Sequence, residues 1–456
     1  MLHDLSLALA SIMITWLSGA SVLLIIFRGE LSVPEFAGFS YIVGAGVTAG
    51  LLYLSSMTGN QFSALYVYLF LAVAFLIVLI IRAKDKHVLF KISIGRDGPS
   101  RYYEYPLIFL VIFIIIAVVA KGISGFPNWD GILNFGFIAK SFFTANKIDM
   151  KFFTDPSRYG HVHLDYPLLL PLLEYWSYHF AGTDNQQLIQ LLSITYYMAF
   201  AGIFYGSIRD TVPRPVALLS LLIVLYNPVI LYDAVGGNAD IVVAVYLIAV
   251  LVVYAKLLVR PSLRTAILLG VLVGFLANVK NEGFAFFTMF SLLLLFTPAV
   301  SKKAWVSYFI PSAVLGLPWF ITKFLYGIRS DLFINLFPQV LMIKSRIHIL
   351  LLSYFYTFTG QGSAVRGTGF LWLIVLLGLI VLFIYKPIRE KYMMLWLPFI
   401  LLFFIYSTVY LITPHSIVWQ LGYSGYRTLT HLVPSLLWLS TVALWERYAS
   451  LKRGKL

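Results

Sequence analysis

The sequence predicts an all-α polytopic membrane protein, because its residues are mostly apolar and fall into long uncharged runs. Of its 456 residues, 60% are hydrophobic and only 11% are charged. The mean hydropathy is +0.89, and a water-soluble globule of this length does not bury so much apolar surface. At about 20 residues per helix, the length allows roughly a dozen transmembrane helices and one or two ordered loops, and the apolar runs predict about 13. We expect residues 1–456 to form a single transmembrane domain.

The apolar runs place the predicted spans along the whole chain. They cover residues 6–27, 36–56, 63–82, 106–122, 187–207, 215–232, 240–258, 265–279, 283–300, 304–324, 368–386, 391–412 and 431–447. Residues 168–182 and 349–363 are also apolar, but counting either one alone as a span would put the basic loops on the wrong side. We expect both to be juxtamembrane helices that lie in the external interface.

The positive charge of the chain indicates its topology. A formal net charge of +14 also occurs in nucleic-acid-binding proteins, but membrane proteins concentrate Lys and Arg in their cytoplasmic loops. Two such basic loops occur here: Arg82, Lys84, Lys86, Lys91, Arg96 and Arg101 before the fourth span, and Lys256, Arg260 and Arg264 between two later spans. We therefore expect a multi-pass plasma-membrane protein that binds no nucleic acid.

The alternation of spans brings five polar segments to the opposite, extracytoplasmic face. They are the first large external loop at 123–186, the turns at 232–240 and 280–282, and the external loops at 325–348 and 413–430. This convergence predicts that the functional site lies on that face. Cysteine is absent, which excludes thiolate zinc sites and cysteine nucleophiles.

Asp130 is the first candidate catalytic residue. It follows Trp129 about one helical turn beyond a predicted span, after the helix-breaking run Gly125-Phe126-Pro127. A carboxylate held at the water interface can accept a proton from an acceptor hydroxyl. The alternative is that Asp130 caps the N-terminus of a helix that begins at Gly131, since Asp is a favoured capping residue.

A second polar group precedes the apolar run at 168–182. His163, Asp165 and Tyr166 have the chemistry to bind a sugar, a phosphate or a divalent cation. With His161 they offer nitrogen and oxygen ligands, but their spacing matches no closed metal site. A hydrogen-bonding role is the alternative, so no metal site is assigned and a divalent metal cofactor stays open.

Two later turns carry further charges. Asp240 begins a span, where a carboxylate is costly unless it is paired or functional, whereas Asp233 is expected to be a solvated turn residue. Lys280 can meet an anionic group, and Glu282 can pair with it. An internal salt bridge between these two residues is the alternative to a binding role.

The last candidates precede the final span, in the segment Tyr423-Ser424-Gly425-Tyr426-Arg427-Thr428-Leu429-Thr430-His431. The Arg427 guanidinium can bind a phosphate in a forked geometry, with Tyr426 and His431 beside it as substrate-binding groups. The alternative is that Arg427 only extends along the span to reach the polar interface, as Arg near a helix end often does.

This pattern resembles the GT-C class of integral-membrane glycosyltransferases, in particular the protein mannosyltransferase and lipid A aminoarabinose transferase group. Four elements carry the resemblance over roughly residues 105–325: Trp129-Asp130, Asp165-Tyr166-Pro167-Leu168, Asn238-Ala239-Asp240 and Val279-Lys280-Asn281-Glu282-Gly283. The chain departs from the group by having about three spans before the large loop, a single acid at Asp130, and Tyr166 in place of the first Pro of a Pro-Pro element.

The resemblance implies a GT-C-like fold and a sugar transfer with inversion, from a polyprenyl-phosphate donor to a hydroxyl of a lipid, glycan or protein acceptor. Asp130 would be the catalytic base and Asp240 a supporting carboxylate, while Lys280 and Arg427 would hold the donor phosphate. A lipid-linked glycan polymerase or ligase is one alternative function. A transporter or flippase is another, although transporters usually place their ionisable groups near the membrane midplane.

Overall fold

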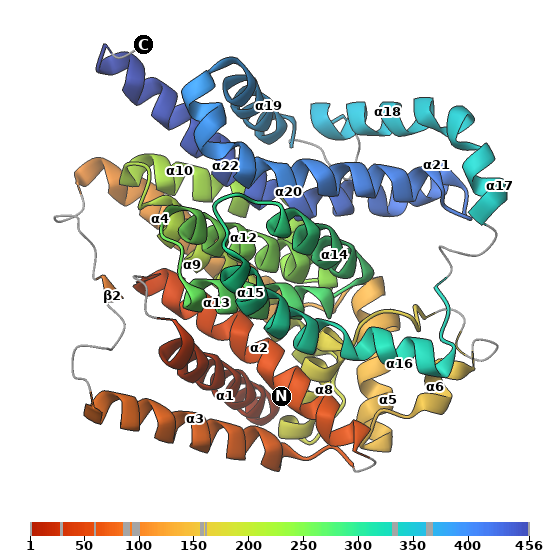
Figure 1. Cartoon of the computed structure of the whole chain (residues 1–456). Helices are drawn as coiled ribbons and strands as arrows, with labels where there is room; N and C mark the ends of the chain where they lie inside the picture. The colour runs from red at the N-terminus through yellow and green to blue at the C-terminus, as the bar shows by residue number, and fades with distance from the viewer. Residues whose placement is uncertain are drawn as a thin grey trace.

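The computed structural model of the chain is a bundle of helices (Figure 1). It describes residues 2–27, 31–58, 61–84, 92–93, 101–155, 159, 162–330, 336–361 and 368–454. The elements of the first half are α1 (Leu2–Ile26), β1 (Leu31–Ser32), α2 (Val33–Met57), α3 (Ala64–Lys84), β2 (Ile92–Ser93), the 3-10 helix η1 (Tyr102–Glu104), α4 (Tyr105–Ser124), the π-helix η2 (Gly131–Gly136), α5 (Phe137–Ala145), α6 (Met150–Thr154), α8 (Leu169–Ala181) and α9 (Gln187–Ile208).

All described elements of the second half are helices. Its elements are α10 (Arg214–Leu225), α11 (Pro228–Ala234), α12 (Ala239–Val259), α13 (Leu263–Ala277), α14 (Asn281–Leu295), α15 (Lys302–Gly316), α16 (Pro318–Tyr326), α17 (Leu336–Leu341), α18 (Ile343–Thr359), α19 (Gly369–Ile384), α20 (Lys386–Leu411), α21 (Ile417–Gln420), the π-helix η5 (Leu421–Gly425) and α22 (Tyr426–Lys452). The two short strands pair in parallel, Leu31 with Ile92 and Ser32 with Ser93.

The prediction of a multi-pass, all-α membrane protein is confirmed at the level of its helices. Among the described residues, eight helices are long and apolar enough to cross a membrane, and two bent pairs raise that number to ten. Every predicted span falls on one of these or on the shorter apolar helices α13, α14 and α19. Because those three have only 15 or 16 residues, the number of 13 spans and the GT-C fold stay predictions.

The two expected juxtamembrane helices differ in their surroundings. In α18 the buried residues Arg346, Leu350, Tyr354 and Thr357 recur every three or four positions, as in a helix with one covered face. In α8, by contrast, residues 169–178 are all buried, and the helix packs against α1, α2, α5 and α9. The expectation that 168–182 lies as an amphipathic surface helix is therefore wrong, since its neighbours cover every face.

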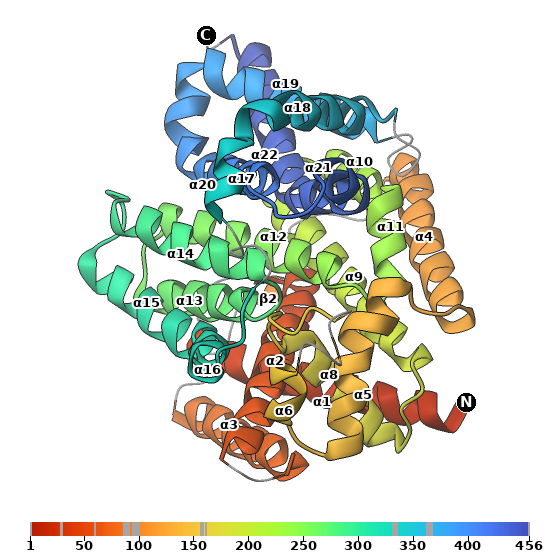
Figure 2. The same ribbon diagram turned by 90° about the vertical axis from the view of Figure 1, so that its right-hand side faces the viewer.

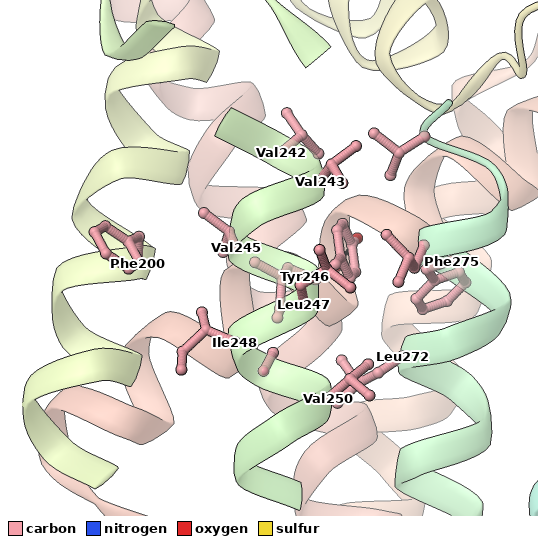
Figure 3. Packing of buried hydrophobic residues seen from close by; sticks show 14 of the residues in the cluster. Phe200, Val242, Val243, Val245, Tyr246, Leu247, Ile248, Val250, Leu272 and Phe275 are labelled. Atoms are coloured by element: carbon pink, nitrogen blue, oxygen red, sulfur yellow. Dashed lines mark hydrogen bonds between the residues drawn. The ribbon is translucent and has the colours of Figure 1, made fainter. Parts of the chain in front are cut away.

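Helix α12 lies at the centre of the bundle, and its surroundings explain its uniformly apolar sequence. It packs against α9, α13 and α22, and all of its residues from Ala239 to Tyr254 are buried. Figure 3 shows its side chains meeting Phe200 of α9 on one side and Leu272 and Phe275 of α13 on the other. Tyr246 also donates a hydrogen bond from its hydroxyl to the carbonyl of Ile42, at 2.6 Å, which ties α12 to α2.

Close approach of helices is achieved with glycine. A Cβ atom on Gly44 of α2 would lie 1.8 Å from the carbonyl oxygen of Thr15 in α1, and one on Gly270 of α13 would lie 2.1 Å from that of Tyr308 in α15. Larger residues at these two positions would push the helix pairs apart. Small residues at helix contacts are typical of membrane proteins, where van der Waals packing holds helices together.

The two ends of α12 carry different charged groups, and the candidate site lies at the end that holds Asp240. Near its C-terminus, Lys256 pairs with Glu35 at 2.9 Å, in the part of the chain that the basic loops predict to be cytoplasmic. Asp240 is the second residue of α12, about 24 Å away along the helix at 1.5 Å per residue. The candidate site is therefore at the opposite end of the bundle from the Lys256 loop.

Candidate functional site

Asp240 is the centre of a buried polar cluster. Its side chain is only 2% exposed, and three groups contact its carboxylate: Lys280 Nζ at 3.0 Å, Arg427 Nε at 3.0 Å and His431 Nε2 at 2.7 Å. A second guanidinium nitrogen of Arg427 also donates to it. The cluster joins the N-terminal ends of α12 and α14 to α22, so residues about 40 and 190 positions apart meet at one carboxylate.

Arg427 connects this buried carboxylate to Asp130. The Arg427 Nη2 atom lies 2.6 Å from an oxygen of Asp130, whose side chain is 34% exposed against 16% for Arg427. The pairing of Arg427 with two carboxylates explains its position better than extension to the membrane interface does. Asp130 is the more exposed carboxylate of the two, since Asp240 is 2% exposed.

Both residues lie beside π-helical turns. The π-helix η2 follows Asp130 directly, and η5 ends one residue before Tyr426 and two before Arg427. Such wide turns are rare in proteins and occur frequently at functional sites. The capping alternative for Asp130 is not supported, because its side chain makes no capping hydrogen bond to the helix. The side-chain oxygen Oδ1 of Asn128 instead accepts a hydrogen bond from the Gly131 backbone N–H at 3.1 Å.

Lys280 links the cluster to its second acid and to an aromatic ring. Its ammonium lies 3.2 Å from Glu282 as well as 3.0 Å from Asp240, and 5.8 Å from the centre of the Tyr166 ring. Burial alone would lower the pKa of Lys280, but Asp240 and Glu282 together raise its pKa well above the usual value. Lys280 therefore stays positively charged, and the Lys280–Glu282 salt bridge, which was the alternative to a binding role, is present.

The predicted group His163, Asp165 and Tyr166 reaches the same cluster through Asn281. The Asn281 amide donates to Asp165 at 2.6 Å, while the Trp319 indole donates to the Asp165 backbone carbonyl at 3.2 Å. His163 is exposed and stacks on Tyr166 with ring centres 4.6 Å apart. Burial raises the pKa of the Tyr166 phenol, which keeps that group neutral. His161 lies outside the described residues.

Two expectations about individual residues change with the structure. Asp233 is 1% exposed and accepts a hydrogen bond from Asn238 at 2.9 Å, so the expectation of a solvated turn residue is wrong. His431 is also 1% exposed, with one ring nitrogen on Asp240 and the other 3.3 Å from the Tyr406 hydroxyl. Its position behind Asp240 suits a supporting role more than direct substrate contact. Tyr426 is half-buried at the start of α22.

The remaining predicted loop lies apart from this arrangement. The described part of 325–348 contacts the 413–430 loop through Arg346, which donates to the carbonyls of Leu411 and Thr413 at 2.9 and 2.8 Å. Three residues to which the sequence assigned no role are Asn281, Tyr406 and Asn128. The backbone N–H of Asn128 donates to the Gly236 carbonyl at 2.9 Å. Asn and Tyr residues are common in any sequence and carry no charge, so only the folded structure shows that these three lie near the predicted charged residues.

The cluster combines an accessible carboxylate with two fixed cations. Arg427 and Lys280 are positively charged and can bind an anionic group. Asp130, beside Arg427, is a hydrogen-bond acceptor. Within the part of the chain that the structure describes, no group of three or more His, Asp or Glu side chains is arranged to hold a metal ion.

No protein family, curated protein or solved structure matches this chain.

Proposed function

We propose that the protein is an integral-membrane glycosyltransferase of the GT-C type, which moves a sugar from a polyprenyl-phosphate donor to an acceptor hydroxyl on the extracytoplasmic face. The observation that carries the proposal is the contact of Arg427 with both Asp130 and Asp240. This contact places the Arg427 guanidinium, which can bind a phosphate, next to the Asp130 carboxylate, which can accept a proton from a hydroxyl. A lipid-linked donor also accords with a site at the ends of apolar helices, where the lipid tail stays in the membrane.

In the proposed reaction, the acceptor oxygen forms a bond to the anomeric carbon as the bond from that carbon to the donor phosphate breaks. The electron pair leaves with the polyprenyl phosphate, and Asp130 takes the proton of the acceptor hydroxyl. Attack opposite the leaving group inverts the configuration. Arg427 and Lys280 stabilise the charge that develops on the phosphate, because both are held by buried carboxylates in a fixed position.

The resting contact between Asp130 and Arg427 gives the donor a second role. While Arg427 holds Asp130, the guanidinium occupies one oxygen of that carboxylate at 2.6 Å. A donor phosphate that competes for Arg427 frees Asp130 to accept a proton. Asp240 keeps Lys280 and His431 as partners during this exchange, so the buried part of the cluster remains neutralised. The base would thus become available only when a donor is bound.

The position of the charges favours this function over transport. Asp240 and Glu282 lie in the first turns of α12 and α14, and Asp130 lies beyond the end of α4. Transporters more often hold their ionisable groups near the midplane of the membrane. A glycan polymerase or ligase would use the same chemistry with a different donor, so only a donor assay separates it from a simple sugar transferase.

The test is donor consumption by the purified protein in detergent. A panel of polyprenyl-phosphate sugars is incubated with a membrane-lipid extract, and products are identified by mass spectrometry for the wild type and for Asp130→Asn. We expect the wild type to consume one donor and the variant to consume none. Glu390→Gln is the matched control, because Glu390 is 65% exposed and lies in a surface pair with Lys386.

Two results would overturn the proposal. If Asp130→Asn transfers sugar at the wild-type rate, Asp130 is not the base. If folded wild-type protein consumes no donor in the panel, transport or glycan polymerisation becomes the better explanation. Circular dichroism and size-exclusion chromatography establish that each variant is folded before its activity is compared.

A further inference from the structure

A cavity of about 620 Å³ opens outside the Asp240 cluster, along α5 and α6. These two helices lie side by side in both views (Figures 1 and 2). Phe137, Phe152 and Tyr159 form an aromatic side of the cavity, and Lys140, Lys151, Asp149 and Asp155 line it with charge. The volume falls within the range of small-molecule sites, which combine apolar walls with a few polar groups.

The aromatic side is a connected group of rings. The ring centres of Phe152 and Tyr159 lie 4.4 Å apart, and those of Phe137 lie 5.9 Å from Phe152 and 6.1 Å from Tyr159. Phe152 is buried, whereas Phe137 and Tyr159 are half-buried, so the latter two leave part of their surface uncovered. Flat aromatic surfaces of this kind pack against the apolar C–H face of a sugar ring.

The polar residues that line the cavity are better suited to bind hydroxyl groups than a ligand with one net charge. Asp149 and Asp155 can accept hydrogen bonds, and Lys140 and Lys151 can donate them. Two negative and two positive residues therefore line the same cavity. Lys140 is fixed by Asp184 at 2.7 Å. A phosphate would meet two carboxylates here, and a lipid tail would desolvate four charged groups at a cost. A sugar hydroxyl both donates and accepts, and therefore fits this mixture.

The cavity is connected to Asp130 by one stretch of helix. Residues 129–145 are helical without interruption, through η2 into α5. Phe137 at the near edge of the cavity is seven residues from Asp130, or about 10 Å at 1.5 Å per residue. Asn134 on the same stretch accepts a hydrogen bond from the His163 amide at 2.8 Å, which holds the segment that carries Tyr166 alongside. A short oligosaccharide seated in the cavity can extend one end to Asp130.

We infer that this cavity binds a carbohydrate portion of the acceptor and thereby selects the hydroxyl that meets Asp130. The inference rests on the proposed function for its link to transfer, but binding of an oligosaccharide can be measured without turnover. The occupant is a neutral or zwitterionic glycan, because the described residues that line the cavity include two acids and two bases.

The experiment is saturation-transfer NMR and titration of the full-length protein in detergent. The probe is the set of water-soluble oligosaccharides released by mild acid from the membrane-lipid extract. We expect binding to wild type and to Asp130→Asn alike, and about fivefold to tenfold weaker binding to Tyr159→Leu and Asp155→Asn. The matched controls are Tyr102→Leu, since Tyr102 is 84% exposed, and Glu390→Gln; both should bind as the wild type does.

Three results would overturn the inference: no binding of the oligosaccharides to wild type, equal affinity in both cavity variants, or displacement of the oligosaccharides by inorganic phosphate. If Tyr159→Leu does not fold, Asp155→Asn still decides the matter. The two proposals fail separately. Oligosaccharide binding without donor consumption refutes only the transferase, whereas donor consumption with unchanged binding in the cavity variants refutes only the acceptor site.

Discussion

The guanidinium of Arg427 lies 2.6 Å from Asp130 and also donates to Asp240. The two carboxylates differ in their surroundings. Asp240 is buried and has Lys280 and His431 as further partners, while a third of the Asp130 side chain is exposed. An incoming anion would therefore displace Asp130 from Arg427 more readily than Asp240, and this difference gives the first prediction.

Asp130→Asn should bind the polyprenyl-phosphate donor more tightly than the wild type, although it transfers no sugar. The substitution removes the carboxylate that competes with the donor phosphate for Arg427, and an increase in affinity of up to about tenfold is expected for one partly exposed ion pair. Isothermal titration with the consumed donor measures it. Weaker donor binding by the folded variant would contradict the competition between Asp130 and phosphate.

Arg427→Lys should raise the apparent KM for the donor about tenfold or more. Lysine retains the charge but presents a single point of contact, whereas the guanidinium holds a carboxylate and a phosphate with separate nitrogens. Steady-state kinetics at varied donor concentration measure the change. Arg260→Lys is the control, because Arg260 is exposed at the other end of α12. An unchanged KM in Arg427→Lys would show that Arg427 does not bind the donor.

The sequence predicted the helices well because long apolar runs have few ways to be accommodated in a membrane. It failed for α8, whose length and aromatic content fit a surface helix but whose burial depends on α1, α2 and α5. Periodicity does not identify a helix that is covered on all sides. The lengths of α14 and α19 were overestimated for a related reason, since the apolar runs continue past the point where each helix ends.

The residues of the candidate site could be selected because charges at the ends of apolar runs are costly unless they are paired or functional. Asp130, Asp240, Lys280 and Arg427 stood out in this way, and the structure brings them into contact. Their pairing could not be predicted, because it depends on how α12, α14 and α22 pack. Asp233 was misjudged for the same reason: a residue beside glycine resembles a solvated turn until its neighbours are known.

Asp240→Asn should lower the free energy of unfolding by about 3–5 kcal/mol, because it leaves Lys280 and Arg427 buried without their shared carboxylate. Denaturant titration in detergent micelles, followed by circular dichroism, measures the loss. Glu446→Gln provides the comparison, since Glu446 pairs with the exposed Lys391, and loss of an exposed pair costs about 1 kcal/mol or less. Equal stability of the two variants would show that the Asp240 contacts do not hold the bundle together.

Glu174 of α8 should make the stability of the protein depend on pH. The side chain is fully buried, and its carboxyl oxygens have no hydrogen-bond partner among the described residues, so burial raises the pKa of Glu174 well above its ordinary value of 4.5. The folded protein thus holds a proton that the unfolded chain releases. Stability from this group is complete below about pH 4.5 and is lost as the pH rises toward the folded-state pKa, by about 1.4 kcal/mol per pH unit.

Glu174→Gln has the same shape and no proton to lose, so it should remove this dependence. Thermal melting of the wild type and the variant in detergent between pH 5 and pH 9 measures it, in about half-unit steps that resolve the slope expected from linkage. The variant should melt at a higher temperature, and its advantage should grow with pH until the buried carboxyl ionises in the folded wild type. Glu390→Gln should track the wild type throughout, because Glu390 is exposed. A constant difference between Glu174→Gln and the wild type at every pH would mean that Glu174 is not held protonated in the folded protein.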